Sequence, residues 1–349
     1  MNTKNVCKEL NISPKALRIY EDYGIVTPKR DENDYRNYSE NDRLKLRQLM
    51  LLKEVGIPLK IIKILLDKEI DEEDKVIRSL ELQLKAIENK IHELEDIKSA
   101  LHESINEVLS NNQNLKVEQC FNKIDKCLNE NQMNRNKWID KWDFDSWAKN
   151  YDKSVYNNSD DCLKLHERYD EVLDIVIERV YANKMEKILD IGCGTGNLFG
   201  KLSNEVKYVG LDQSIEMLLQ AKRKYSGIKL RLGNFLDRAF INNEFDGIVS
   251  TYAFHHLKTE DKYKAIDIIS DYLKDEGKII IADLMFLNDA EKQKCKEKFI
   301  NEGNAELWEV VEDEYYSNIY ELKEFCETKG LKLSYEYIVS FTWIITISK

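Results

Sequence analysis

The chain has 349 residues and a formal net charge of -11, and 34% of its residues are charged. This length exceeds what one hydrophobic core usually serves, so we expect two or three domains. The acidic balance excludes a chain that binds nucleic acid along its whole length. The first 69 residues nevertheless hold more Lys and Arg than Asp and Glu, which indicates a nucleic-acid-facing segment joined to a part with another task.

The cysteines and the apolar runs exclude further classes. The 7 cysteines are scattered without the close spacing of a zinc or redox motif, so we expect neither a disulfide framework nor a metal site. No apolar run reaches the roughly 18 residues of a membrane span, and the start of the chain lacks the core of a signal peptide. We therefore expect a cytoplasmic protein that does not enter a membrane.

Two short helices are predicted at the start of the chain. The first runs through TKNVCKEL, and Ser13 can cap a second helix that has Pro14 at its first position. The short connection between them predicts a helix-turn-helix. Leu17 faces inward on the second helix, which leaves Lys15 and Arg18 on another face. IVTPKR and DYRNY then predict two short strands that form a wing.

This segment, from Asn2 to about Lys68, resembles the DNA-binding domain of the MerR family of transcriptional regulators. The matching stretches are ALRIYEDYGIVTPKR, YRNYS and GIPLKIIKILL, and Ile19 departs from the family, which usually has an aromatic residue there. The resemblance implies a double-stranded DNA operator and RNA polymerase as partners. The residues expected at the DNA are Lys15, Arg18, Tyr20, Lys29, Arg30, Tyr35, Arg36 and Tyr38.

The middle of the chain carries a coiled-coil pattern. From Ile77 to Leu94, apolar residues recur at alternating spacings of three and four, and the pattern resumes after a slip at Ile97. The pattern alone fits a helix packed on its own domain as well as a helix paired with a second copy. MerR relatives pair such a helix, so the resemblance implies a homodimer. We expect the winged domain over residues 1–70, a dimerisation helix over 71–112 and a linker over 113–140.

The stretch KILDIGCGTGN, residues 187–197, is an apolar run that reaches Asp190 and breaks into glycines. A dinucleotide fingerprint needs a further glycine where this chain has Asn197, and a carboxylate beside the loop repels a pyrophosphate. The same carboxylate attracts a cation, and S-adenosylmethionine carries two positive groups. A second short strand ends at Asp212, whose carboxylate oxygens can accept hydrogen bonds from both hydroxyls of a ribose.

The order of strand, glycine turn, helix, strand and acidic residue resembles the class I S-adenosylmethionine-dependent methyltransferases. Strand and helix patterns continue to alternate to the end of the chain, which predicts an α/β doubly wound, Rossmann-like sheet over residues 141–349. Asn234 stands where the family often has an acidic residue at the adenine, and Tyr151 belongs to a segment that resembles a lid. The residues expected at the cofactor are Asp190, Gly192, Gly194, Gly196, Asp212, Asn234, Phe235 and Tyr151.

The stretch STYAFHHL follows the fourth strand, where the transferable methyl group should point. Methyl transfer from a sulfonium depends mainly on orientation, and a base is needed only if the acceptor carries a proton. His255 or His256 is the candidate base. The alternative is that the histidine pair is a structural feature of this loop, as it also is in the family.

These observations predict a multidomain chain: a winged helix-turn-helix domain rich in α-helix, a coiled-coil helix and a methyltransferase domain. The first hypothesis is a DNA-binding regulator fused to an enzyme that methylates a small molecule with S-adenosylmethionine. The alternative is a regulator whose methyltransferase fold only senses S-adenosylmethionine or another small molecule.

Overall fold

The structure is a computed structural model, which describes residues 1–32, 35–66, 75–110, 125, 147–157 and 163–349. The chain divides into two compact units, Met1–Asp140 and Lys141–Lys349. Apart from residue 125, the linker expected over 113–140 lies outside the described residues. None of the described helices is both long and apolar enough to cross a membrane.

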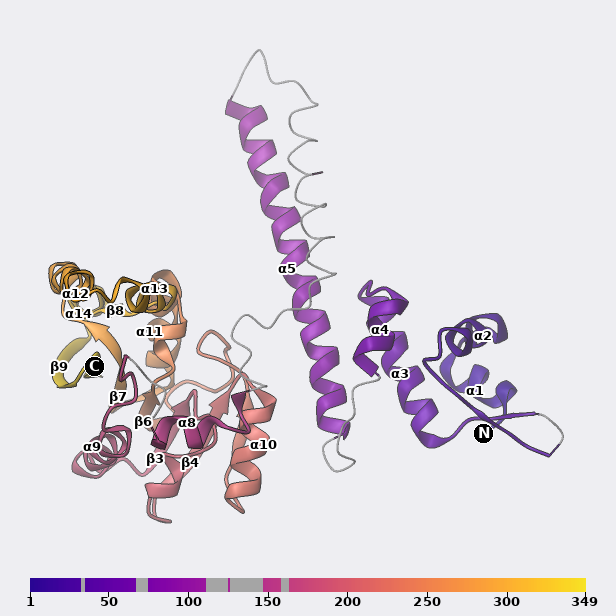
Figure 1. The fold of residues 1–349 in the computed structure, drawn as a ribbon, viewed down its shortest axis with the longest axis horizontal. Helices are drawn as coiled ribbons and strands as arrows, with labels where there is room; N and C mark the ends of the chain where they lie inside the picture. Colours follow the sequence, from indigo (N-terminus) through magenta and orange to yellow (C-terminus); the bar gives the residue numbers. More distant parts are fainter. Residues whose placement is uncertain (33–34, 67–74, 111–124, 126–146, 158–162) are drawn as a thin grey trace. The chain divides into compact units, whose positions relative to one another are not determined.

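The first unit begins with the expected helix-turn-helix (Figure 1). Helix α1 (Thr3–Leu10) ends at Asn11, whose left-handed φ of 52° turns the chain. Helix α2 (Pro14–Asp22) starts at Ser13, whose side chain accepts a hydrogen bond from the backbone of Ala16. This cap satisfies one of the backbone donors that a helix start leaves unpaired, so the sequence sets the turn locally.

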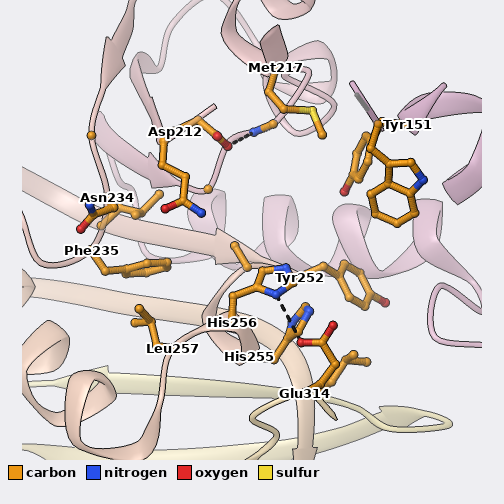
Figure 2. A pocket seen from close by; sticks show the side chains of 18 of the residues that line it. Tyr151, Asp212, Met217, Asn234, Phe235, Tyr252, His255, His256, Leu257 and Glu314 are labelled. Atoms are coloured by element: carbon orange, nitrogen blue, oxygen red, sulfur yellow. Dashed lines mark hydrogen bonds and ion pairs between the residues drawn. The ribbon is translucent and has the colours of Figure 1, made fainter. Parts of the chain in front are cut away.

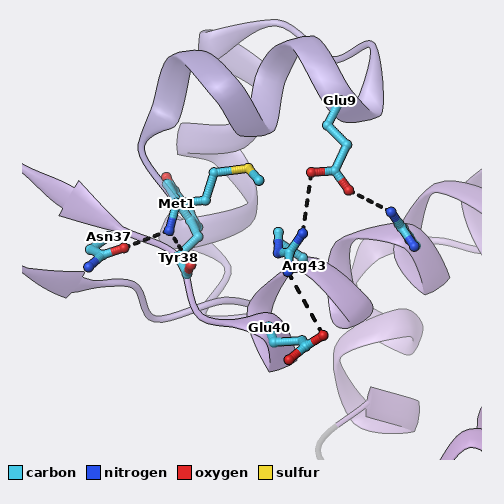
Figure 3. Close-up of polar contacts among 7 residues, drawn as sticks. Met1, Glu9, Asn37, Tyr38, Glu40 and Arg43 are labelled. Atoms are coloured by element: carbon cyan, nitrogen blue, oxygen red, sulfur yellow. Dashed lines mark hydrogen bonds and ion pairs between the residues drawn. The ribbon is translucent and has the colours of Figure 1, made fainter.

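The wing is a two-stranded antiparallel sheet of β1 (Lys29–Arg30) and β2 (Arg36–Asn37). Helix α3 (Glu40–Glu54) follows, with a capping box in which Ser39 and Asp42 bond each other's backbone. Polar contacts fasten these parts together (Figure 3). The backbone nitrogen of Met1 donates to Asn37 on the wing at 2.6 Å, and Glu9 on α1 pairs with Arg43 on α3 at 3.5 Å.

Two further helices complete the described part of this unit. Helix α4 (Leu59–Leu66) is mostly apolar, and it packs Ile62 and Leu66 into the same core as α1, α2 and α3. Helix α5 (Lys75–Ser110) is 36 residues long and adds Ala86 to that core. The expected long helix is therefore present within residues 71–112.

The second unit is built on one mixed sheet. Its strand order is β5-β4-β3-β6-β7-β10-β9, and β8 pairs with β7 beside this path. The strands from β5 to β7 are parallel, and β10 is antiparallel to both of its neighbours. The strands are β3 (Lys187–Ile191), β4 (Lys207–Asp212), β5 (Leu230–Leu232), β6 (Phe245–Thr251), β7 (Leu273–Phe286), β8 (Ser317–Asn318), β9 (Lys332–Val339) and β10 (Thr342–Ser348).

Helices cover the sheet and close its core. Helices α11 and α14 pack their apolar residues against the alternate strand residues of one face, whereas α9 lies against β6 and β7. Because successive side chains of a strand point to opposite faces, both faces are apolar here and both are buried. The helices are α8 (Tyr151–Asn157), α9 (Tyr169–Ala182), α10 (Ile215–Lys224), α11 (Thr259–Tyr272), α12 (Asp289–Asn301), α13 (Ala305–Asp313) and α14 (Ile319–Thr328).

One expected element is absent from this unit. The glycine turn was expected to lead into an α-helix, but only a short 3-10 turn, Phe199–Lys201, follows it. Gly196 has a φ of +79°, which an α-helix does not allow. At Gly200 an added Cβ would lie 2.2 Å from the hydroxyl oxygen of Tyr225, so the turn packs closely against that side chain.

Candidate active site

A cavity of about 310 Å³ opens where the parallel strands β3, β4, β5 and β6 end (Figure 2). Ligands of doubly wound sheets bind at this edge, because the loops after the strands meet there. Most of the expected cofactor residues line the cavity, and Gly196 and Asp190 do not. The expected residues in its wall are Tyr151, Gly192, Gly194, Asp212, Asn234, Phe235, His255 and His256.

The glycine loop forms one wall of the cavity. Gly192 and Gly194 have φ values of +75° and +52°, which favour glycine. A Cβ on Gly192 would lie 2.2 Å from the Cβ of Ala253, so the backbone can approach the loop after β6 only without a side chain. Gly196 faces away and packs on Tyr225 and Ile228.

Asp212 lies at the end of β4 and holds the glycine loop. Its Oδ2 accepts a hydrogen bond from the backbone of Gly194 at 2.8 Å, and its Oδ1 accepts one from Ser214 at 2.8 Å. These two bonds fix the carboxylate beside the glycine loop. The side chain is directed into the cavity (Figure 2).

Asp190 does not face the cavity, which corrects its expected contact with a cationic ligand. It is 1% exposed, and its neighbour Ile191 lines the cavity instead. Its Oδ2 accepts from the hydroxyl of Tyr208 at 2.7 Å, and its Oδ1 has no hydrogen-bond partner among the described residues. Burial raises the pKa of Asp190 to about 7, and the charge of Asp212 adds to this effect.

Asn234 and Phe235 follow β5 on the side of the cavity near Asp212. The side-chain oxygen of Asn234 accepts from the backbone of Leu236 at 2.8 Å. The ring of Phe235 lies edge to face with Phe254, with 5.5 Å between ring centres. The cavity wall therefore carries an amide and the edge of a ring that is 6% exposed and otherwise packed in the core.

Tyr151 stands at the start of α8 and lines the opposite wall of the cavity with Trp147. Their rings meet edge to face at 5.8 Å, and burial raises the pKa of the Tyr151 phenol. The next residue, Asp152, ties α8 to the glycine loop. It accepts hydrogen bonds from Thr195 at 2.5 Å and from Asn197 at 3.1 Å, so the expected lid segment and the glycine loop are held together.

His255 and His256 lie together at the far end of the cavity, on the 3-10 turn Phe254–His256. Nδ1 of His255 lies 2.5 Å from Oδ1 of Asp283, a fully buried residue of β7. Burial alone would raise the pKa of the Asp283 carboxyl, but His255 and the surrounding hydrogen bonds hold it below its usual range. The carboxylate thereby fixes the orientation of the imidazole.

His256 pairs with a residue that sequence reasoning missed. Nδ1 of His256 lies 3.3 Å from Oε2 of Glu314, which follows α13. Burial lowers the pKa of His256 and the neighbouring His255 lowers it further, while Glu314 acts in the opposite direction. The side chain of His256 is therefore mainly neutral at pH 7.

Comparisons with known proteins agree with these two units. Residues 188–277 match the methyltransferase-domain family, and residues 1–69 match the MerR helix-turn-helix family of regulatory proteins. An uncharacterised methyltransferase of Oceanobacillus iheyensis is 36% identical over 207 residues, which are 59% of this chain and 95% of that protein. One of Anoxybacillus flavithermus is 34% identical over 59% of this chain and 96% of that protein.

The chain belongs to the methyltransferase family. Its first 69 residues form a MerR-type domain, so the expected fusion of the two is confirmed. Among solved structures, a putative S-adenosylmethionine-dependent methyltransferase of Methanococcus maripaludis covers 60% of this chain and 96% of its own, with 22% identity and a TM-score of 0.43.

The MerR-type domain brings part of its expected DNA contacts together. Lys15 and Arg18 on α2 are exposed, and both line a shallow hollow with Arg36 of the wing. Nε of Arg36 donates to Glu21 at 2.8 Å, which holds the guanidinium beside α2. On the wing, Lys29, Arg30 and Tyr35 are exposed.

Two tyrosines are removed from the expected DNA contacts. Tyr20 is 3% exposed and Tyr38 is 2% exposed, and both rings pack in the core of the MerR-type domain. Their hydroxyl groups are hydrogen-bonded within the domain: Tyr38 donates to Glu21, and the hydroxyl of Tyr20 accepts from Lys53 at 3.4 Å. Aromatic residues often combine a buried ring with a hydrogen-bonded hydroxyl in this way.

Proposed function

We propose that this methyltransferase transfers the methyl group of S-adenosylmethionine to a small molecule. We further propose that the MerR-type domain of the same chain binds DNA and regulates transcription. The observation that carries this proposal is the cavity, whose two ends differ in chemistry. One end offers Asp212, Asn234 and Phe235, and the other offers His255 and His256. The cavity of about 310 Å³ is of the size that small-molecule sites usually have.

The cofactor end is assigned by the chemistry of its side chains. Asp212 would accept hydrogen bonds from the ribose hydroxyls, and Asn234 and Phe235 would hold the adenine. The loop at Gly192 and Gly194 lets the backbone approach the methionine part. When bound, S-adenosylmethionine supplies a methyl group on a positively charged sulfur. The aromatic ring of Tyr151 would attract this charge by a cation–π interaction.

The acceptor end is the end with the histidines. In-line displacement needs the acceptor atom opposite the departing sulfur, and the walls of the cavity would provide that alignment. His255 and His256 assist the loss of a proton from an acceptor that carries one at pH 7. Asp283 orients His255, and Glu314 orients His256.

The MerR-type domain would act as half of a two-fold symmetric reader of operator DNA. A stripe of apolar residues along α5 is exposed and supports pairing of two copies of this helix. A symmetric dimer would place two winged domains on two half-sites, in contact with RNA polymerase at a promoter. Such a role places the chain in the cytoplasm, where the DNA is. The stripe is Leu80, Leu84, Ile91, Leu94, Leu101 and Ile105.

Incubation with methyl-labelled S-adenosylmethionine and a cell extract tests the enzyme directly. We expect label to enter a small molecule in the presence of the full-length chain. A cofactor that shifts the affinity for operator DNA without any transfer of label would instead identify a sensor. Label that enters only protein or nucleic acid would contradict the proposed class of acceptor.

A further inference from the structure

Three side chains at the acceptor end converge as metal ligands do. The donor atoms of His255, His256 and Glu314 all lie within 4.8 Å of one another, and all three residues line the cavity. Their side chains are 8%, 19% and 21% exposed, so this is not a cluster of exposed acidic groups. Figure 2 shows the imidazole of His256 beside the carboxylate of Glu314.

Buried contacts hold two of these residues in place. Oδ1 of Asp283 lies 2.5 Å from Nδ1 of His255, and the Asp283 carboxylate also accepts a hydrogen bond from the backbone nitrogen of His255 at 2.9 Å. The ring nitrogen of His255 that can bind an ion is therefore Nε2. A carboxylate on the second nitrogen of a ligating histidine is the usual outer support of a metal site. The backbone of Tyr315 donates to the carbonyl of His255 at 3.1 Å, so the residue next to Glu314 is fastened to the histidine turn.

Two carboxylates lie at this end of the cavity, near a buried lysine. The carboxylates of Asp283 and Glu314 are balanced in part by Lys262, which is 1% exposed. The ammonium group of Lys262 donates to the carbonyl of Tyr315, so it is held by a backbone group on the side of the site. The charge of Lys292 also reaches Lys262, so the two carboxylates face two ammonium groups, and the case for an ion rests on the convergence of the three ligands.

We propose that His255, His256 and Glu314 bind one divalent transition-metal ion such as Zn²⁺, with an open position that faces the cavity. Two histidines and a glutamate are a known ligand set for zinc sites that keep a position for substrate. Bonds of about 2.0 to 2.1 Å in a tetrahedron place ligand atoms about 3.3 Å apart, which is the distance between Nδ1 of His256 and Oε2 of Glu314. All the donor atoms lie within 4.8 Å, so the remaining side chains would move closer on binding.

This inference deepens the proposed function and rests on it for the acceptor. With the ion bound, the two histidines act as its ligands and no longer as bases. A thiol or hydroxyl group of the small molecule takes the open position, and its proton leaves to solvent water because the ion lowers its pKa. The lone pair of that sulfur or oxygen then forms the bond to the methyl carbon. The bond from that carbon to the sulfonium sulfur breaks with its electrons on sulfur, which leaves a neutral thioether.

Zinc uptake by the full-length chain tests the site. The chain is stripped with a chelator and dialysed against Zn²⁺, and the zinc per chain is then measured. The compared variants are His256→Ala, Glu314→Gln and a matched control, His166→Ala, which removes another histidine of the same cavity. Binding of S-adenosylhomocysteine to each variant, measured by calorimetry, reports separately on the cofactor end.

We expect one zinc ion per wild-type chain and per His166→Ala chain. His256→Ala and Glu314→Gln should each weaken the affinity for zinc by more than about 100-fold. Loss of a residue that only supports a ligand, without binding the ion, usually weakens it about 10- to 100-fold. Wild-type chain that binds S-adenosylhomocysteine but takes up no zinc overturns the metal site and leaves the proposed function standing. Zinc affinity that is unchanged in both ligand variants also overturns the site. Failure to bind S-adenosylhomocysteine would instead contradict the proposed function.

Discussion

The two units of this chain present opposite kinds of working surface. The MerR-type domain offers exposed charges, Lys15 and Arg18 on α2 and Lys29 and Arg30 on the wing. The methyltransferase domain offers a cavity in which Asp212 and His255 are buried and most other polar groups are half-buried. Solvent screens the first set, whereas burial strengthens every interaction in the second.

This difference determines how each unit should respond to change. Exposed cations share the contact with DNA, so each removal should have a modest effect that depends on salt. A buried group in the cavity has partners that cannot be replaced by water, so one substitution there should have a large effect. The predictions below start at the cavity and end at the exposed surface.

The largest effect is expected at His256. His256→Ala should lower the rate of label transfer by about 10²- to 10⁴-fold, because the acceptor would keep its proton. The affinity for S-adenosylhomocysteine should stay within about twofold, since His256 lies at the other end of the cavity. His102→Ala, an exposed histidine of α5, is the control and should transfer label at the wild-type rate. An equal loss of rate in both variants would contradict the assignment.

Asp190 should make the stability of the methyltransferase domain depend on pH. Its pKa is raised from 3.8 to about 7 in the folded domain, so the unfolded chain releases this proton first. Stability should therefore fall as pH rises through that window, by up to about 4 kcal/mol. Asp190→Asn keeps an acceptor for Tyr208 and should be stabilised relative to wild type at pH 8 but not at pH 3.5.

Urea unfolding of both proteins at the two pH values measures this difference. Glu260→Gln, an exposed change in the first turn of α11, serves as the control for the loss of one negative charge. A pH dependence that is the same in wild type and Asp190→Asn would show that Asp190 titrates normally.

Substitutions at two glycines, Gly192 and Gly227, distinguish the cost of backbone strain from the cost of a steric clash. Gly192→Ala and Gly227→Ala both place a side chain at positive φ, which costs about 1 to 2 kcal/mol. Only at Gly192 does the new Cβ meet another atom, at 2.2 Å from Ala253, which adds about 1 to 3 kcal/mol of overpacking. Thermal unfolding should rank Gly192→Ala as the less stable variant. The reverse order would show that this wall of the cavity yields easily.

The smallest single effects are expected on the exposed surface. Lys15→Ala and Arg18→Ala should each reduce the slope of log affinity against log salt by about 0.9, because fewer counterions are released. Arg43→Ala is the charge-matched control, since Arg43 is engaged by Glu9 inside the domain. Operator titrations at several salt concentrations measure the slopes. If all three variants kept the wild-type slope, Lys15 and Arg18 would not contact DNA.

The cofactor end of the cavity could be predicted from the sequence because its parts follow consecutive strands. Gly192, Gly194 and Asp212 lie within one strand-turn-strand unit, where spacing in the chain fixes position in space. The prediction for Asp190 was wrong because successive side chains of a strand point to opposite faces. Its neighbour Ile191 is the residue that faces the cavity.

The acceptor end could be predicted only in part. His255 and His256 follow β6 and were visible as a pair, but Asp283 and Glu314 come from β7 and from the end of α13. Only the packing of the sheet and its helices determines that these side chains meet. In the MerR-type domain, Tyr20 and Tyr38 were assigned to DNA by motif, although the helical spacing of Tyr20 from Leu17 already favoured the core.

The central claim is that the cavity at the strand ends binds S-adenosylmethionine through Asp212. Calorimetry with S-adenosylhomocysteine tests it most directly, on wild type, Asp212→Ala and Asp212→Asn, with operator binding as the check that the MerR-type domain is intact. Loss of two charge-assisted hydrogen bonds predicts an affinity weakened about tenfold to a thousandfold in Asp212→Ala, and less in Asp212→Asn, which keeps one acceptor oxygen. Operator affinity should be unchanged. Wild-type affinity for S-adenosylhomocysteine in Asp212→Ala would contradict the account.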